Sequence, residues 1–258
     1  MGSSDSVPVQ ATATSMAIVE ALSTRETAGV TELAEELGIS KSAVHIHLST
    51  LSDLGYVAGT GGAYRLTHRF LQLGLATRER NPVFRFGRAE LRNLARSTGE
   101  IVNLVVPEGY NGVYLYRIGE GEHPIPEGGT AELHASAAGK AILAFRSHDA
   151  VDEYVEETSL PARTDRTITD PSALRAELRS ISDRRIAFDR GEQTPDWQCV
   201  ASPIVVGGQP VGAISVSGPA DRMQGKRLEE DTTGLVVSTA KSIELSLLSA
   251  AEPVEEFA

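Results

Sequence analysis

The chain has 258 residues, more than one typical domain, and 41% of them are hydrophobic, enough for packed cores. Its net charge is −11, and no apolar run approaches the roughly 20 residues of a membrane-spanning helix. The first residues lack the basic and apolar regions of a secretory signal, and Cys199 is the only cysteine. These features argue against a membrane-embedded protein and against a secreted protein with internal disulfides, and we expect a cytoplasmic protein.

Residues 13–68 have the pattern of a winged helix-turn-helix domain, and the polar residues 1–12 before them are expected to be disordered. A first helix is expected near residues 15–22. A second is expected to use Thr31 as its N-cap and to end at Gly38, because glycine adopts the left-handed conformation cheaply. Its buried face consists of apolar residues at helical spacing: Val30, Leu33, Ala34 and Leu37.

A third helix follows after a turn of only three residues. Ser40 is expected to cap it, and its buried stripe is Val44, Leu48, Leu51 and Leu54. Two helices joined by so short a turn form a helix-turn-helix. Residues 56–58 and 63–66 then flank a glycine-rich segment, which predicts a β-hairpin, the wing.

The outer face of the third helix has the composition of a surface that enters the major groove of DNA. Its first turns carry small, polar or methyl-bearing side chains and no negative charge. Hydroxyl and imidazole groups reach base edges, and an exposed Ile46 can meet a thymine methyl. Arginines beside the helix and on the wing can contact phosphates. The predicted DNA-binding residues are Arg25, Ser40, Lys41, Ser42, Ala43, His45, Ile46, Ser49, Thr50 and Arg65. The alternative is an ordinary helical hairpin with a solvated face.

The acidic net charge is compatible with DNA binding because of where it lies. Residues 1–80 contribute only −2, whereas residues 81–258 contribute −9. Lysine is scarce, since 20 of the 24 basic residues are arginine. An acidic, lysine-poor surface keeps a protein soluble in strong salt, so we expect a halophilic source.

Residues 69–81 predict a linker helix, residues 82–250 a second domain, and residues 251–258 an acidic tail. Asn81-Pro82 is a strong helix start and Gly99 a stop. Strands are expected at 101–107 and 113–118 around an Asn111-Gly112 turn, helices at 137–146, 149–157 and 171–184, strands at 186–189, 200–206 and 211–217, and a long helix at about 226–250. The fold class is therefore α+β, in which the second domain is a sandwich of antiparallel strands and covering helices.

The apolar residues around the linker are too many for a free segment. They are Phe70, Leu71, Leu73, Leu75, Val83, Phe84 and Phe86. An exposed apolar surface of this size indicates an interface. We expect the N-terminal helix and residues 70–86 to form a homodimer or homotetramer.

Three motifs of the second domain resemble the IclR family of transcriptional regulators. They are LHASAAGKAILAF at 133–145, RRIAFDRGEQTPDWQCVASPI at 184–204 and VGAISVSGPADRM at 211–223, and with the winged helix the resemblance covers about residues 15–250. It implies a GAF-like effector-binding domain, an oligomer that binds palindromic operator DNA, and a response to a small metabolite, often an organic acid. The third helix departs from the family, which often reads KSTVHRLL, because Ile46 stands at the arginine position.

The strand at 211–217 places Ser215 and Ser217 on one face, with their hydroxyls roughly 7 Å apart. If that face is covered, both hydroxyls need partners, and a carboxylate or hydroxylated ligand supplies them. The resemblance implies that the effector is held by Asp189, Cys199, Ser215 and Ser217, together with backbone amides near Ala137 and Ala138. We expect a sugar acid or keto acid with one carboxylate. The alternative is that both serines are exposed hydroxyls at an edge of the sheet.

Catalytic and metal chemistry find little support in the sequence. Cys199 with His134 is a weak nucleophile pair, since a buried thiol is more common. Residues 138–141 lack the upstream glycine and the Ser/Thr of a phosphate loop. His45 and His47 point to different faces of their helix and do not make a metal site. We expect no enzyme activity, cofactor or metal. The competing hypothesis is a GAF-like sensor or enzyme whose winged helix binds protein instead of DNA.

Overall fold

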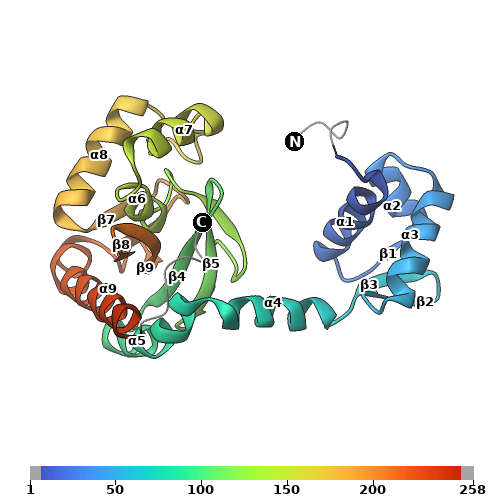
Figure 1. Ribbon diagram of the computed structural model, residues 1–258, viewed down its shortest axis with the longest axis horizontal. Coiled ribbons are helices and arrows are strands. Elements are labelled where there is room, and N and C mark those ends of the chain that lie inside the picture. Colours follow the sequence, from blue (N-terminus) through green and yellow to red (C-terminus); the bar gives the residue numbers. More distant parts are fainter. Residues whose placement is uncertain (1–6, 251–258) are drawn as a thin grey trace. The chain divides into compact units, whose positions relative to one another are not determined.

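The computed structural model describes residues 7–250, which form two compact units that divide between Arg78 and Glu79. The predicted limits of 13–68, 69–81 and 82–250 place this division inside the linker helix. The N-terminal unit contains α1 (Gln10–Ser23), β1 (Ala28–Gly29), α2 (Val30–Leu37), α3 (Lys41–Asp53), β2 (Val57–Thr60), β3 (Ala63–Leu66) and most of α4 (Arg69–Arg80) (Figure 1). Among the described residues, no helix combines the length and apolarity needed to cross a membrane.

The helix-turn-helix and its wing are confirmed. Ser40 Oγ caps α3 by accepting the Ala43 N–H at 3.2 Å, and Gly38 ends α2 with a φ of +66°. In the wing, Thr60 pairs with Ala63 across a turn of two glycines, both at positive φ. Such a turn matches the twist of a hairpin. β1, β3 and β2 form the small antiparallel sheet in that order.

Several expectations for this unit were wrong in detail. α1 begins at Gln10, so residues 10–12 are helical and not disordered; residues 1–6 lie outside the described part. α2 begins one residue before Thr31, because the Glu32 carboxylate accepts the Gly29 N–H at 2.7 Å and fixes the start there. Leu54 is 54% exposed, since α3 ends at Asp53 and the stripe stops at Leu51.

The C-terminal unit is a six-stranded antiparallel sheet between two layers of helices (Figure 1). The strand order is β6-β5-β4-β9-β8-β7. Its elements are α5 (Pro82–Thr98), β4 (Ile101–Glu108), β5 (Asn111–Ile118), β6 (Thr130–Glu132), α6 (Ala137–Leu143), α7 (His148–Thr158), α8 (Pro171–Arg184), β7 (Ala187–Arg190), β8 (Trp197–Val206), β9 (Gln209–Pro219), the π-helix η2 (Arg227–Asp231) and α9 (Thr232–Ser249).

Each face of the sheet has its own apolar core. α6, α7 and α8 pack on one face, against a row that includes Val105, Tyr114 and Ala213. α5 and α9 pack on the other, against residues such as Leu104 and Ile214. Side chains alternate between the two faces of a strand. Because helices cover both faces of this sheet, both sets of side chains are buried, and β4 and β9 are apolar almost throughout.

The elements of this unit were predicted well, with four corrections. The β4–β5 turn is Gly109-Tyr110, since Glu108 pairs with Asn111 and Gly109 has a φ of +56°. Gly112 is needed instead for close packing, because a Cβ there would lie 2.8 Å from Val105 Cγ1. β6 was missed, α6 stops at Leu143, and the last helix starts as η2 before α9. The acidic tail at 251–258 lies outside the described residues.

The linker residues expected to form an interface belong to different environments. Phe70 packs on Tyr56 in the N-terminal unit, with ring centroids 5.3 Å apart. Val83 and Phe84 are buried in the core of the C-terminal unit. Leu71, Leu73 and Leu75 are exposed on α4, a helix without any buried residue. Phe86 is partly buried against the core of the C-terminal unit, so the three exposed leucines are the linker residues that remain candidates for an interface.

Gly139 allows α6 to pack directly on the chain before it. A Cβ at this position would lie 2.3 Å from the Leu133 oxygen and 2.4 Å from Leu133 Cα. Because both atoms are backbone, Gly139→Ala should lower the free energy of unfolding by about 3 kcal/mol or more in urea titrations. Gly234→Ala in α9, where no atom lies within 4 Å, should raise it by about 0.5–1 kcal/mol. Equal effects of the two substitutions would contradict this packing.

Candidate functional site

The exposed side of α3 carries most of the predicted DNA-binding residues. Lys41, Ser42, His45, Ile46, Ser49 and Thr50 are all exposed. Ile46 is the most apolar of them and has 65% of its surface exposed. Ala43 is half-buried, and Ser40 is occupied as the cap of the helix. The face therefore presents hydroxyls, an imidazole and methyl groups with no carboxylate in its first three turns.

The arginines near this face differ in the partners that their side chains already have. Arg65 is exposed on β3, and its Nη1 donates to the Leu66 carbonyl at 3.2 Å. Arg25 forms a surface ion pair with Glu36, with 2.7 Å between Nη2 and Oε2. His47 is half-buried against Ser15, at 2.9 Å, so it belongs to the packing of α1 on α3.

The predicted effector residues come together on the sheet face beneath α6. Antiparallel pairing puts Ser217, Cys199 and Asp189 side by side on β9, β8 and β7. Ser215 lies one rung along the same face of β9. All four are at most 8% exposed, so the serines are not exposed hydroxyls at an edge.

A small cavity of about 10 Å³ lies at this position, enough for about one water molecule. Four of the residues predicted to hold the effector line it, namely Ala137, Asp189, Cys199 and Ser217. Ser215 and Ala138 are close by in the core but do not line it. The lining residues not predicted are Tyr114, His123, Pro124, Ile125, Ser136, Gln193, Thr194 and Trp197.

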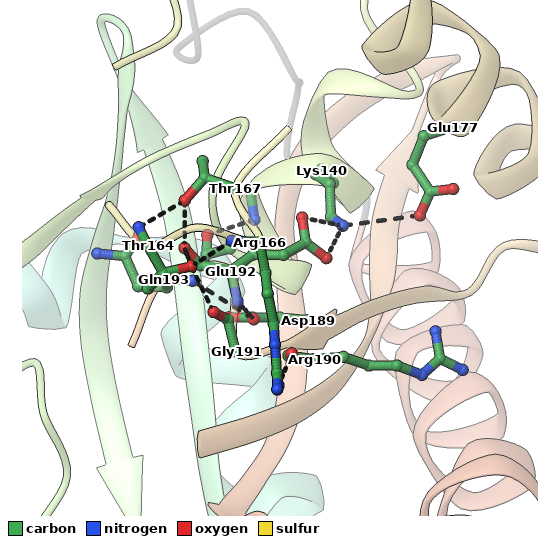
Figure 2. A network of polar contacts seen from close by, with 12 residues as sticks. Lys140, Thr164, Arg166, Thr167, Glu177, Asp189, Arg190, Gly191, Glu192 and Gln193 are labelled. Atoms are coloured by element: carbon green, nitrogen blue, oxygen red, sulfur yellow. Dashed lines mark hydrogen bonds and ion pairs between the residues drawn. The ribbon is translucent and has the colours of Figure 1, made fainter. Parts of the chain in front are cut away.

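A buried ion pair holds the loop that follows β7, next to Asp189 (Figure 2). Lys140 Nζ lies 2.6 and 2.7 Å from the two Glu192 carboxylate oxygens and 3.6 Å from Glu177. The Glu192 carbonyl accepts the Thr167 hydroxyl at 2.6 Å. Asp189 Oδ1 in turn accepts the Glu192 N–H at 2.6 Å and the Gln193 N–H at 3.4 Å.

Burial raises the pKa of Asp189 to about 7, although the Glu192 N–H partly offsets the shift. Burial also raises the pKa of Glu192, while Lys140 lowers it. The face of the sheet beneath α6 therefore holds a carboxyl group that is readily protonated near neutral pH.

Sequence reasoning missed a polar network on β4 and β5. Asn103 is fully buried on β4, paired across the sheet with Ser215 and with Arg117. Arg117 reaches the Asn103 oxygen, the Ile125 carbonyl and His123 Nδ1. A single asparagine in an otherwise apolar strand, Ile101–Val106, was the available signal, because a buried polar side chain requires partners.

Two further groups at the cavity have unsatisfied polar atoms. The Trp197 Nε1 donor and the Gln193 Oε1 acceptor are buried and have no hydrogen-bond partner. His123 is neutral at the same place, since burial and the neighbouring Arg117 lower its pKa to about 4. Buried polar groups of this kind are ready to receive a ligand that both accepts and donates hydrogen bonds.

A nucleophilic role for Cys199 has no geometric support. Burial raises the pKa of its thiol well above its usual range, whereas a reactive cysteine needs the thiolate. His134 is occupied by the Tyr154 hydroxyl at 2.8 Å and the Pro161 carbonyl at 3.0 Å. In the part of the chain that the structure describes, no cluster of three or more His, Cys, Asp or Glu side chains has metal-binding geometry.

Asp189 should make stability depend on pH. Its pKa is raised in the folded state from 3.8 to about 7, so the folded state binds the proton more tightly than the unfolded state. The resulting stabilisation is complete below about pH 4 and is lost as the pH rises towards 7. Asp189→Asn keeps the Oδ1 acceptor and removes the titration, so its unfolding free energy should fall less between pH 5 and pH 8 in urea titrations. Parallel curves for both proteins would contradict the assignment.

Comparison with known proteins agrees with this architecture. The model of the IclR helix-turn-helix domain matches residues 13–61, and that of the bacterial transcriptional regulator IclR C-terminal domain matches residues 76–245. The regulator BhcR of Paracoccus denitrificans is 31% identical, over 96% of this chain and 90% of its own. The probable regulator ArcR of Halobacterium salinarum is 30% identical, over 90% of this chain and 92% of its own.

Solved structures show the same fold. The Thermotoga maritima IclR structure superposes with a TM-score of 0.77 at 28% identity, and the match covers 92% of this chain and 97% of that one. Both domains are thus matched in sequence and in three dimensions. The chain belongs to the IclR family of transcriptional regulators, with a DNA-binding winged helix and an effector-binding α/β domain.

Proposed function

We propose that this regulator binds a two-fold symmetric operator by inserting α3 into the major groove, with the β2–β3 wing along the phosphate backbone. The observation that carries the proposal is the α3 face itself, which exposes Ile46 among hydroxyls and an imidazole with no carboxylate in its first turns. Arg65 and Lys41 supply phosphate contacts. Arg25 contributes only if it leaves Glu36. Bound to DNA in this way, the protein acts in the cytoplasm and needs no catalytic step.

Two glutamates on the α3 face should abolish specific DNA binding. His45→Glu with Ile46→Glu places two negative charges against the groove, and both positions are exposed, so the fold should be retained. The measurement is a mobility shift at fixed salt, with a duplex enriched from random sequence by the wild-type protein. We expect the enriched site to be a pseudo-palindrome.

The matched control is Ala173→Glu with Ala176→Glu on α8, two exposed positions that add the same charge elsewhere. It should bind the duplex as the wild type does. If the α3 variant binds the duplex normally, DNA is contacted by residues other than this face of α3. If no sequence is enriched, the competing hypothesis of a winged helix that contacts protein is favoured.

We also propose a homodimer or homotetramer whose interface includes α1 and the exposed leucines of α4. Leu71 and Leu75 are one helical turn apart and 59% and 39% exposed. Leu71→Glu with Leu75→Glu should therefore reduce the mass measured by light scattering. Gln72→Glu with Ala76→Glu, shifted by one residue on the same helix, should leave it unchanged. A wild-type mass for the leucine variant places the interface elsewhere.

For the effector, we propose a monocarboxylic acid that carries hydroxyl or keto groups, such as a sugar acid. Ser217 and the unpartnered Trp197 Nε1 offer donors to oxygen atoms, and Gln193 Oε1 offers an acceptor to a hydroxyl. In its ionised form, Asp189 disfavours a second anionic group close to it. Ala137, Ala138, Cys199 and Ser215 complete the surroundings. One relative is named for the acetate operon, which agrees with a role in carboxylic acid metabolism.

Trp197 provides a direct readout, because it is the only tryptophan of the chain and lies at the cavity. Titration with glycolate, glycerate, gluconate and pyruvate should change its fluorescence and shift operator binding, whereas benzoate and lysine should do neither. Ser215→Ala with Ser217→Ala should erase both responses to the acid and leave operator binding intact. A double variant that still responds to the acid shows that the site lies elsewhere.

A further inference from the structure

We propose that Asn103, held by Arg117, fixes the direction of the Ser215 and Ser217 hydroxyls, so that the effector site selects a hydrogen-bond acceptor such as a carboxylate. Asn103 is then a positioning residue that determines specificity without touching the effector. The inference rests on the proposed function, in which these serines face the effector.

The geometry consists of one row across the sheet. Asn103 Nδ2 lies 3.1 Å from Ser217 Oγ and 3.4 Å from Ser215 Oγ, and Asn103 Oδ1 lies 2.8 Å from Arg117 Nε. Asn103 and both serines are at most 1% exposed, so water does not compete for these bonds.

The orientation of the Asn103 amide follows from Arg117. The Nε–H of arginine can only donate, and so the group that faces it must be the amide oxygen. A flipped amide would set two donors against each other in a buried place, which costs the desolvation of both. Asn103 must therefore present its NH₂ group to the serines.

This orientation determines what the serines offer to a ligand. Each hydroxyl accepts a hydrogen bond from Asn103, and its single proton is left to point away. Ser217 lines the cavity, so its proton is available to an acceptor on an effector bound there. An acceptor oxygen of the ligand can take a hydrogen bond from the Ser217 hydroxyl, whereas an ammonium or amide N–H of the ligand would face another donor. A site whose buried polar groups require a hydrogen-bond acceptor binds a ligand that presents a donor there much more weakly.

The test compares acids with their neutral amides, glycerate against glyceramide and glycolate against glycolamide, by Trp197 fluorescence. The wild type should bind each acid at least about tenfold more tightly than its amide, since one hydrogen bond to a charged group is involved. Asn103→Ala should reduce this ratio to near one, with operator binding retained.

Two variants of Arg117 separate its effect on the orientation of the Asn103 amide from the effect of its charge. In Arg117→Gln the side-chain Nε2 takes the position of the arginine Nε and can still donate to Asn103, although the charge is gone. In Arg117→Met that donor is absent and the amide is free to flip. We expect the glutamine variant to keep the preference for acids and the methionine variant to lose it. Unfolding curves of each variant check that the domain is folded.

The outcomes are distinct. If Gln and Met variants lose the preference equally, the charge of Arg117 selects the acid and the inference is wrong. It is also wrong if Asn103→Ala and Arg117→Met both keep the wild-type ratio while the double serine variant loses binding, in which case the proposed effector site stands. If no acid changes Trp197 fluorescence, the proposed effector class fails, and this inference with it.

Discussion

The effector domain depends on the ion pair between Lys140 and Glu192. Lys140 is 1% exposed, so its charge is tolerated only because the Glu192 carboxylate meets it directly. That contact joins α6 to the loop after β7. The same loop sends backbone N–H groups to Asp189 and carries Gln193 to the cavity. This charged contact thus helps to position the groups that the loop brings to the cavity, and the buried Thr167 hydroxyl holds the same loop by donating to the Glu192 carbonyl.

The residues of the proposed effector site come from neighbouring strands more than from successive positions of one strand. Polar side chains on β4, β5, β7, β8 and β9 meet because antiparallel register aligns them on one face, under a layer of helices that excludes water. Their hydrogen bonds are mutually dependent, since each buried donor or acceptor needs its neighbour. Arg117, Asn103 and Ser217 therefore work as one unit. The DNA-binding unit differs in this respect, because most of the side chains predicted to contact DNA are exposed on its surface.

The sequence was sufficient for patterns that act locally. Caps at Ser40 and Asn81 and the helix ends at Gly38 and Gly99 were predicted, because each is decided by neighbouring residues, and the glycine-rich segment predicted the hairpin of the wing. The IclR motifs predict which residues face the effector, and strand register brings Asp189, Cys199 and Ser217 together on one face of the sheet. What remained hidden depends on tertiary contacts: Gly112 looked like a turn residue but serves close packing, and Phe84 looked like an interface residue but lies in a core. Asn103 and Trp197 could not be recognised as site residues from the sequence, because only the strand register places Asn103 beside Ser215 and only the fold places Trp197 at the cavity.

The small size of the cavity has a consequence for how sensitively the regulator responds. A metabolite of several heavy atoms exceeds a space of about 10 Å³, so binding at the proposed effector site requires lining segments such as those of Pro124 and Gln193 to move. Molecules in which these segments are closed do not bind the ligand, so opening is a cost that binding must meet. The apparent dissociation constant is the intrinsic one divided by the fraction of molecules that are open. Changes in the covering segment can therefore retune the metabolite concentration at which the switch operates, while every atom that touches the metabolite stays the same.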